Sequence, residues 1–194
     1  MIIALTGIMG SGKSSVGREL RALLSCYFID LDEYIETKAG CSINSIFAEK
    51  GEAAFRTMEA DCLRKIIDTH NNTDTLVLSL GGGTVTNPDC ARLVYDRTFC
   101  IFLTAAPETV AERLFAEAST RSGLAADSRP ILQGARTKAD IAARISDLLS
   151  KREASYRAAS RHIIPTDSLS QSEIAETIHS FIGNNSFISS CHPK

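Results

Sequence analysis

The sequence predicts an α/β domain in which a parallel sheet is covered by helices on both faces. Short apolar runs rich in Ile, Val, Leu and Phe recur without the strict alternation of a half-exposed strand. Helical segments separate these runs, and a glycine-rich loop follows the first one. The expected strands occupy residues 2–6, 27–29, 76–80, 99–103 and 162–164. The expected helices occupy residues 13–25, 31–38, 43–49, 52–69, 88–96, 107–118, 137–160 and 170–182.

Composition bounds the class of protein. The chain has 194 residues, of which 44% are hydrophobic and 23% are charged, and its formal net charge is −2. We expect one globular domain over residues 1–182, and a tail over 183–194 without chemistry. No apolar run approaches the roughly 18 residues of a membrane span, and no signal peptide is expected. No basic face indicates nucleic acid as a partner.

Cysteine usage indicates the compartment. The six cysteines form no C-x-x-C pair, and several of them lie inside apolar runs. This pattern favours reduced, structural thiols over disulfides. We therefore expect a cytoplasmic protein. We also expect a monomer that binds neither membranes nor nucleic acid.

The first strand runs into a P-loop. Residues Gly7–Ser14 have the spacing G-x-x-x-x-G-K-S between a buried strand and a helix. Glycines let backbone N–H groups turn inward onto phosphate oxygens, the helix N-terminus adds positive potential, and the lysine adds a full charge. The alternative is a glycine-rich turn that holds a lysine by chance. The residues expected to hold a nucleotide are Gly10, Ser11, Gly12, Lys13, Ser14 and Ser15.

The second strand ends in two acidic residues, Asp30 and Asp32. If extended geometry continues, both side chains share one face at the carboxyl edge of the sheet, where ligands bind in such folds. Asp32 could instead only cap the helix that follows. Two carboxylates at this edge favour contacts with a metal and with a substrate hydroxyl.

The third strand ends in Ser79, followed by Leu80 and the glycines 81–83. Many P-loop enzymes place an aspartate here to hold the hydration shell of the metal. Since this chain has a serine, we expect Asp30 to supply the charge near Mg²⁺. The three glycines are either a plain turn or a segment that lets a ligand approach the backbone closely, and we favour the second interpretation.

Two arginines lie in semi-apolar helical settings. At helical spacing, Arg152 and Tyr156 fall within the stripe formed by Ile141, Ile145 and Leu148. An inward arginine needs an anionic partner, which is either a protein carboxylate or a ligand. Arg56 lies near the start of the helix that contains Phe55, Met58 and Cys62. Each arginine alone is more often part of a structural ion pair, but together they could clamp a carboxylate or a phosphate.

The segment over about 119–130 has no periodicity and ends at Arg129. It is either a surface loop or a mobile lid that excludes water during phosphoryl transfer. Arg129 is correspondingly either a solvated charge or an arginine that the lid delivers onto phosphates.

In this order, the segments resemble the shikimate kinase family from the P-loop to about residue 160. Residues 28–36 are similar to the family's F-x-D-x-D-x-x-I-E segment, and residues 55–59 resemble F-R-x-x-E. Residues 80–83 are similar to its glycine run. Residues 129–132 are similar to the lid sequence R-P-L-L with one isoleucine in place of leucine, and residues 151–156 resemble K-R-x-x-x-Y.

The resemblance implies a P-loop NTPase-type three-layer fold, whose five parallel strands have the order 2-3-1-4-5, with a mobile lid. It implies ATP on the P-loop and Mg²⁺ bound by Ser14, with Asp30 and Ser79 acting through water. The shikimate-binding residues that it implies are Asp32, Arg56, Gly81, Gly82, Gly83 and Arg152. It suggests Arg121 as a residue that stacks on adenine, although the lid aligns poorly, and leaves the rest of the adenine pocket unassigned.

The resemblance therefore predicts the transfer of the ATP γ-phosphoryl group to the 3-hydroxyl of shikimate, a step in aromatic amino-acid biosynthesis. Lys13, Asp32 and Arg129 are the expected catalytic residues. One rival is a related kinase for another small hydroxy acid such as gluconate, and only a substrate profile separates the two. The other rival is an inactive nucleotide-binding protein. The presence of Lys13, Ser14, Asp30 and Arg129 argues against the inactive protein.

Overall fold

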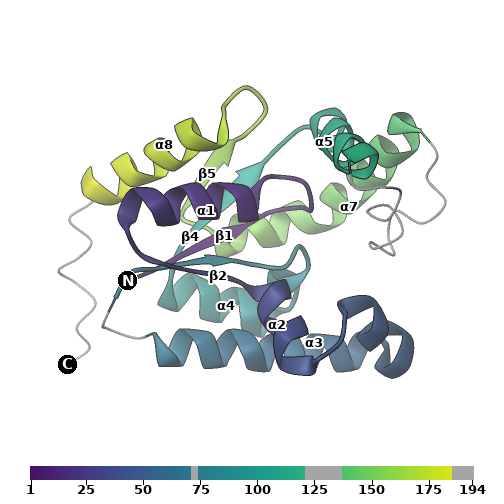
Figure 1. Cartoon of the computed structure of the whole chain (residues 1–194), viewed down its shortest axis with the longest axis horizontal. Helices are drawn as coiled ribbons and strands as arrows, with labels where there is room; N and C mark the ends of the chain where they lie inside the picture. The colour runs from purple at the N-terminus through teal and green to yellow at the C-terminus, as the bar shows by residue number, and fades with distance from the viewer. Residues whose placement is uncertain (71–73, 121–136, 185–194) are drawn as a thin grey trace.

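The computed structural model contains one parallel five-stranded sheet between two layers of helices (Figure 1). It describes residues 1–70, 74–120 and 137–184. The strand order is β2-β3-β1-β4-β5, as the family resemblance implies. The strands are β1 (Ile2–Thr6), β2 (Tyr27–Asp30), β3 (Leu76–Ser79), β4 (Phe99–Thr104) and β5 (His162–Pro165).

Every pair of neighbouring strands is parallel, so the carboxyl ends of all five strands meet at one edge of the sheet. The register places Leu5 of β1 beside Ser79 of β3, and Ser79 beside Asp30 of β2. The ends of the three strands that carry the predicted polar residues are therefore in line. This alignment decides where a site can form.

One face of the sheet is covered by α1 (Lys13–Leu24) and α8 (Gln171–Asn184). Ile3 and Leu5 point to this side, because alternate residues of a strand face opposite ways. Val16 and Leu20 of α1 and Ile178 of α8 complete this half of the core. Asn184 ends α8, two residues beyond the predicted end of the domain at 182, and residues 185–194 of the predicted tail lie outside the described residues.

The opposite face is covered mainly by α3 (Ile43–Thr69), α4 (Pro88–Arg97) and α7 (Lys138–Ala159), with the short 3₁₀ helix η1 (Thr84–Thr86) beside them. Ala4, Leu78 and Phe102 of the sheet face this layer. The helix α5 (Pro107–Thr120) packs on α7 near the carboxyl edge.

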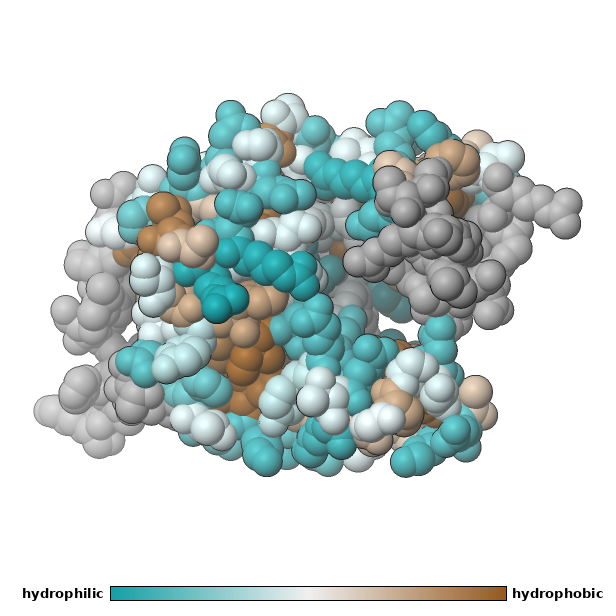
Figure 2. Space-filling model, in the orientation of Figure 1, coloured by the Kyte–Doolittle hydropathy of each residue, from teal (hydrophilic) through white to brown (hydrophobic). Residues whose placement is uncertain are grey.

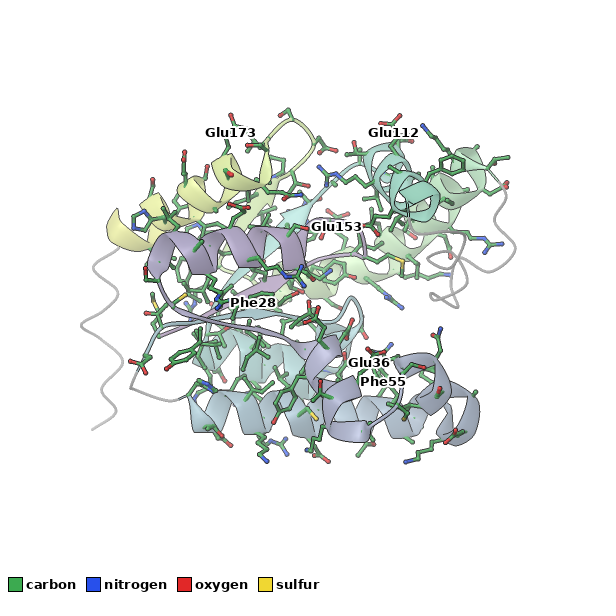
Figure 3. The ribbon with its side chains drawn as sticks, in the orientation of Figure 1. Phe28, Glu36, Phe55, Glu112, Glu153 and Glu173 are labelled. Carbon is green, nitrogen blue, oxygen red and sulfur yellow. The ribbon has the colours of Figure 1, made fainter. Side chains whose placement is uncertain are left out.

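The helices α2 (Leu31–Ala39) and α3 form a unit that extends beyond the carboxyl edge of the sheet (Figure 1). Gly51 interrupts α3 with φ 78° and ψ 171°, which agrees with the two helices predicted over 43–49 and 52–69. The Glu36 carboxylate accepts a 2.8 Å hydrogen bond from the Ile43 N–H, and Figure 3 labels Glu36 in this unit. The first turn of α3 is thereby fixed to α2.

Charged and polar side chains cover most of the face shown in Figure 2, which also shows a hydrophobic patch around β2. β2 is an edge strand, and each of its four residues is at least partly exposed. Within the described ranges, no helix combines the length and the apolar composition needed to cross a membrane. The cysteines described there, at 26, 41, 62, 90 and 100, have free thiols.

Candidate active site

The P-loop curls over the end of β1 because three of its glycines adopt positive φ. Gly7, Gly10 and Gly12 have φ values of 143°, 73° and 95°. A Cβ atom at Gly7 would overlap the carbonyl oxygen of Leu103, so only glycine fits there. The turn is closed by a 3.2 Å hydrogen bond from the Ser11 N–H to the Ile8 carbonyl. This loop leads directly into α1 and has the strand–loop–helix context that the motif requires.

Lys13 lies folded against the loop. Its Nζ atom donates 2.9 Å hydrogen bonds to the carbonyl oxygens of Gly7 and Ile8, and the side chain is 9% exposed. The ammonium charge is therefore held at the mouth of the phosphate cradle. A phosphate oxygen placed in the cradle would meet this charge together with the N-terminus of α1.

Three oxygen-bearing side chains meet beside the N-terminus of α1. The Ser14 hydroxyl donates a 2.5 Å hydrogen bond to Asp30 Oδ2, and its oxygen lies 3.4 Å from the Ser79 Oγ. Hard oxygen donors of this kind suit Mg²⁺, which usually keeps several waters and binds one or two carboxylates together with substrate phosphates. No group of three or more His, Cys, Asp or Glu side chains in the described part of the chain could hold a metal alone. The donor set fits a nucleotide-bound Mg²⁺.

Asp30 and Asp32 would share a face only if extended geometry continued past Asp30, and it does not. β2 ends at Asp30, and Leu31 already begins α2. Asp30 is also the N-cap of that helix, a role considered for Asp32, since its Oδ1 accepts from the N–H groups of Asp32 (3.1 Å) and Glu33 (3.4 Å). The unpaired N–H groups of a new helix are satisfied best by the side chain just before it. Both aspartates still lie at the carboxyl edge, one at the strand end and one in the first helical turn.

Asp32 lies in a crowded acidic position next to Gly81. A Cβ atom at Gly81 would lie 2.8 Å from both Asp32 Oδ1 and Glu59 Oε1. Burial raises the pKa of the Asp32 carboxyl from 3.8 to about 6, and the Asp30 and Glu59 charges push it in the same direction while Lys13 opposes them. A carboxyl with this pKa is poised to accept a proton near neutral pH.

Arg56 is held beside the glycine segment by a buried acid. Its Nη1 atom lies 2.7 Å from Glu59 Oε2, and Glu52 forms a second, exposed ion pair at 3.2 Å. Glu59 is only 2% exposed and also accepts a 2.6 Å hydrogen bond from the Thr84 hydroxyl. The guanidinium abuts Gly83, where a Cβ atom would approach Nη1 and Nη2 to 2.6 Å. Glycine at this position leaves Arg56 room to present its planar group.

Arg152 reaches the same segment from α7. Its Nη1 donates a 3.2 Å hydrogen bond to the Gly82 carbonyl, and the side chain is partly buried. Tyr156, one turn later and fully buried, donates a 2.5 Å hydrogen bond to the same carbonyl oxygen. The helical spacing in the sequence therefore identified an inward-facing pair of side chains. The Gly81–Gly83 segment also approaches the P-loop, since a Cβ atom at Gly82 would lie 3.5 Å from the Met9 nitrogen.

Sequence reasoning missed Arg113 of α5. This side chain donates to the Thr166 carbonyl at 2.5 Å and to the Thr166 hydroxyl at 3.0 Å, and it lies 3.5 Å from the Gly10 carbonyl of the P-loop. It thus links α5, the P-loop and the segment after β5. The only signal in the sequence was its place between Val110 and Leu114, whose side chains pack against Gly10.

The remaining predicted site residues, Arg121 and Arg129, lie outside the described residues, as does the predicted lid apart from its first two positions, 119 and 120. Gly10, Ser11, Gly12 and Ser15 lie in the P-loop or the first turn of α1, as predicted. The described site is therefore built from residues that follow β1, β2 and β3 and from α3 and α7.

Comparison with known proteins identifies a family. A model of the shikimate kinase family matches residues 9–183. A shikimate kinase of Thermus thermophilus is 42% identical over 176 residues, which cover 91% of this chain and 86% of the relative. One from Chlorobium limicola is 40% identical over 162 residues, covering 81% and 75%.

Solved structures of shikimate kinases have the same fold as this chain. A shikimate kinase from Acinetobacter baumannii, in complex with shikimate, superposes with a TM-score of 0.82 at 31% identity, covering 96% of this chain and 94% of that one. A shikimate kinase from Bacteroides thetaiotaomicron gives 0.81 at 29% identity, covering 94% and 98%. With the P-loop, the strand order and the family match in agreement, the chain belongs to the shikimate kinase family, the enzymes that phosphorylate shikimate with ATP.

Proposed function

We propose that this chain transfers the γ-phosphoryl group of ATP to the 3-hydroxyl of shikimate at the edge where β1, β2 and β3 end. The observation that carries the proposal is the convergence of Asp32, Arg56 and Arg152 on the Gly81–Gly83 segment beside the P-loop. One acid and two cations around a stretch of backbone without side chains suit a small molecule with a hydroxyl to activate and a carboxylate to pair.

The phosphates of ATP occupy the P-loop in this proposal. Backbone N–H groups of residues 12–15 and the Lys13 ammonium bind them, with Lys13 exchanging its two carbonyl partners for phosphate oxygens. Ser14 would hold Mg²⁺ directly, and Asp30 and Ser79 would hold its waters. When bound, Mg²⁺ supplies positive charge to the phosphate oxygens as negative charge redistributes during transfer.

Asp32 orients the 3-hydroxyl and accepts its proton. Its raised pKa makes the carboxylate a stronger base than an exposed aspartate, while most of it stays ionised near pH 7. The hydroxyl oxygen then attacks the γ-phosphorus in line, ADP leaves, and shikimate 3-phosphate remains. Gly81 keeps this position free, because any side chain there would displace the Asp32 carboxylate.

Arg56 and Arg152 bind the shikimate carboxylate and so select the substrate. Glu59 fixes Arg56 in place from a buried position, which lowers the entropy lost when the substrate binds. Arg152 turns from the Gly82 carbonyl to the carboxylate. A planar guanidinium provides two parallel donors, which a carboxylate matches with two oxygens.

The nucleoside part of bound ATP would extend from the P-loop toward β4 and β5, on the side away from Asp32. Arg113 bridges Gly10 and Thr166 there. We include Arg113 among the residues that border the nucleoside. Arg121 is proposed to stack on adenine, and Arg129 is proposed to reach the phosphates only when the lid closes. We also propose a monomer in the cytoplasm, whose reducing conditions suit the free thiols of the described residues.

A coupled assay of ADP release tests the proposal. We expect MgATP turnover to require shikimate, and the product to carry phosphate on the 3-hydroxyl by NMR. Gluconate is the matched control, because it is also a small hydroxy acid with a carboxylate. Equal turnover with gluconate would overturn the substrate assignment, and no ADP release with either acid would indicate an inactive nucleotide-binding protein.

A further inference from the structure

The carbonyl oxygen of Gly82 accepts hydrogen bonds from two side chains of α7. The Tyr156 hydroxyl lies 2.5 Å from it and Arg152 Nη1 lies 3.2 Å from it. Tyr156 is fully buried and its ring packs on Phe102, with ring centroids 5.1 Å apart. The phenol is therefore held at this oxygen by rigid packing, whereas Arg152 is partly exposed and has the length to move.

The position of the Gly82 carbonyl determines where the next N–H points. The described peptide bonds are all trans, so the Gly82 C=O and the Gly83 N–H lie on opposite sides of one planar unit. Two donors from α7 hold the oxygen toward that helix, which directs the Gly83 N–H the other way. Gly83 abuts the Arg56 guanidinium, and its N–H donates no backbone hydrogen bond within the described residues. The N–H is available to a ligand beside Arg56.

Arg152 has two competing acceptors under the proposed function. In the structure it donates to Gly82, and in the proposed complex it donates to the substrate carboxylate. Gly82 is partly buried, and a buried acceptor costs free energy when it loses a donor that nothing replaces. The second donor, Tyr156, keeps the Gly82 oxygen satisfied after Arg152 has turned away.

We propose that Tyr156 is a positioning residue for shikimate: its hydroxyl fixes the Gly82–Gly83 peptide so that the Gly83 N–H faces the substrate, and it releases Arg152 to bind the carboxylate. The inference rests on the shikimate site proposed above. Burial raises the pKa of the Tyr156 phenol, which keeps it protonated and able to donate.

The first test is Tyr156→Phe, which keeps the ring and removes the hydroxyl. We expect calorimetry to show shikimate affinity weakened by about tenfold, the scale of one lost neutral hydrogen bond. We expect the affinity for MgADP and kcat at saturating shikimate to stay within about twofold. Tyr95→Phe is the matched control, since Tyr95 lies 43% exposed on α4 and loses the same atom. Replacing Tyr156 by 4-aminophenylalanine, which retains a donor at that point, should restore the affinity.

A double-mutant cycle separates this role from mere packing. In an Arg152→Ala background there is no arginine to release, so we expect Tyr156→Phe to weaken shikimate binding by only about threefold or less. A lower unfolding temperature with unchanged shikimate affinity would make Tyr156 only structural and overturn the inference. An equal effect of Tyr156→Phe in both backgrounds would overturn the release of Arg152. If Arg152→Ala alone left shikimate binding intact, the proposed shikimate site itself would be refuted, rather than the role of Tyr156 within it.

Discussion

Asp30 binds two partners with its two carboxylate oxygens. Oδ2 accepts the Ser14 hydroxyl at 2.5 Å, and Oδ1 caps α2 through the N–H groups of Asp32 and Glu33. The same residue therefore joins the P-loop helix to the helix that carries Asp32. If Asp30 also holds the waters of Mg²⁺, as proposed above, its structural effect and its effect on the metal can be separated by mutation.

We predict that Asp30→Asn raises the Mg²⁺ concentration needed for half-maximal activity by about tenfold or more, because the amide lacks the charge that attracts the hydrated ion. Stability should change little, since asparagine caps a helix as well as aspartate does. Asp30→Ala should show the same Mg²⁺ effect and lose about 1 kcal/mol of unfolding free energy. Activity against Mg²⁺ and urea unfolding measure the two effects, and a parental Mg²⁺ dependence for Asp30→Asn would exclude the metal role.

Lys13→Met should abolish phosphoryl transfer while the fold survives. The ammonium donates two hydrogen bonds to loop carbonyls, and we expect its charge to serve the phosphates rather than the core. We expect a loss of about 3 kcal/mol or more in transition-state stabilisation, which is roughly a hundredfold or more in kcat/KM. Circular dichroism provides the control for folding. Turnover within about tenfold of the parent would refute the assignment of the P-loop lysine.

The pKa of about 6 at Asp32 predicts a pH dependence. Below that pH the carboxylate is protonated, so kcat/KM for shikimate should fall by about tenfold per pH unit. The native state binds this proton more tightly than the unfolded chain does. The contribution of Asp32 to the unfolding free energy should therefore decrease as the pH rises from about 4 to about 6.

Asp32→Asn should flatten that part of the stability curve and remove most of the activity. Urea unfolding at several pH values and a pH profile of kcat/KM check both statements. An acid limb centred near the ordinary value of 3.8 would contradict the raised pKa.

Arg152→Lys should weaken shikimate binding by about 1–3 kcal/mol, the range of a charge-assisted hydrogen bond, because lysine keeps the charge but not the planar fork. The affinity for MgATP should barely change. Calorimetric titration of each ligand measures this. Lys151→Arg is a matched control, since Lys151 is exposed and pairs with Asp147 one helical turn earlier rather than with the glycine segment. Unchanged shikimate affinity in Arg152→Lys would leave Arg152 as a purely structural contact.

Gly17→Ala should destabilise the fold. A Cβ atom there would overlap the Phe28 ring, which lies against α1 (Figure 3). Such an overlap costs about 1–3 kcal/mol. It opposes the gain of roughly 1 kcal/mol that alanine gives over glycine within a helix, and we expect the cost to exceed the gain. Gly183→Ala in α8 is the control, because no atom of the described residues lies within 4 Å of its Cβ position, and it should not lower the unfolding free energy. Thermal unfolding of both variants tests the packing of α1 on β2.

Much of the site was predictable because its signals are local. The P-loop depends on a fixed spacing of glycines, and the register of Arg152 and Tyr156 depends on the helical period, so both could be read without tertiary contacts. Asp30 was predicted at the strand end, and capping of the next helix was considered only for Asp32, as an alternative. Capping by Asp30 was missed because strand and helix meet at one residue, where patterns define boundaries least well.

Chain order and local chemistry determined the alternating strands and helices, the phosphate loop, and the identity of the charged groups that serve it. Only the tertiary structure decided that Glu59 would be buried against Thr84, that Arg113 would reach Gly10, and that two α7 side chains would meet on one Gly82 oxygen. These contacts join residues up to 103 positions apart. They depend on how helices pack on a twisted sheet. That packing is determined by side-chain volume and burial, and only when the whole core assembles.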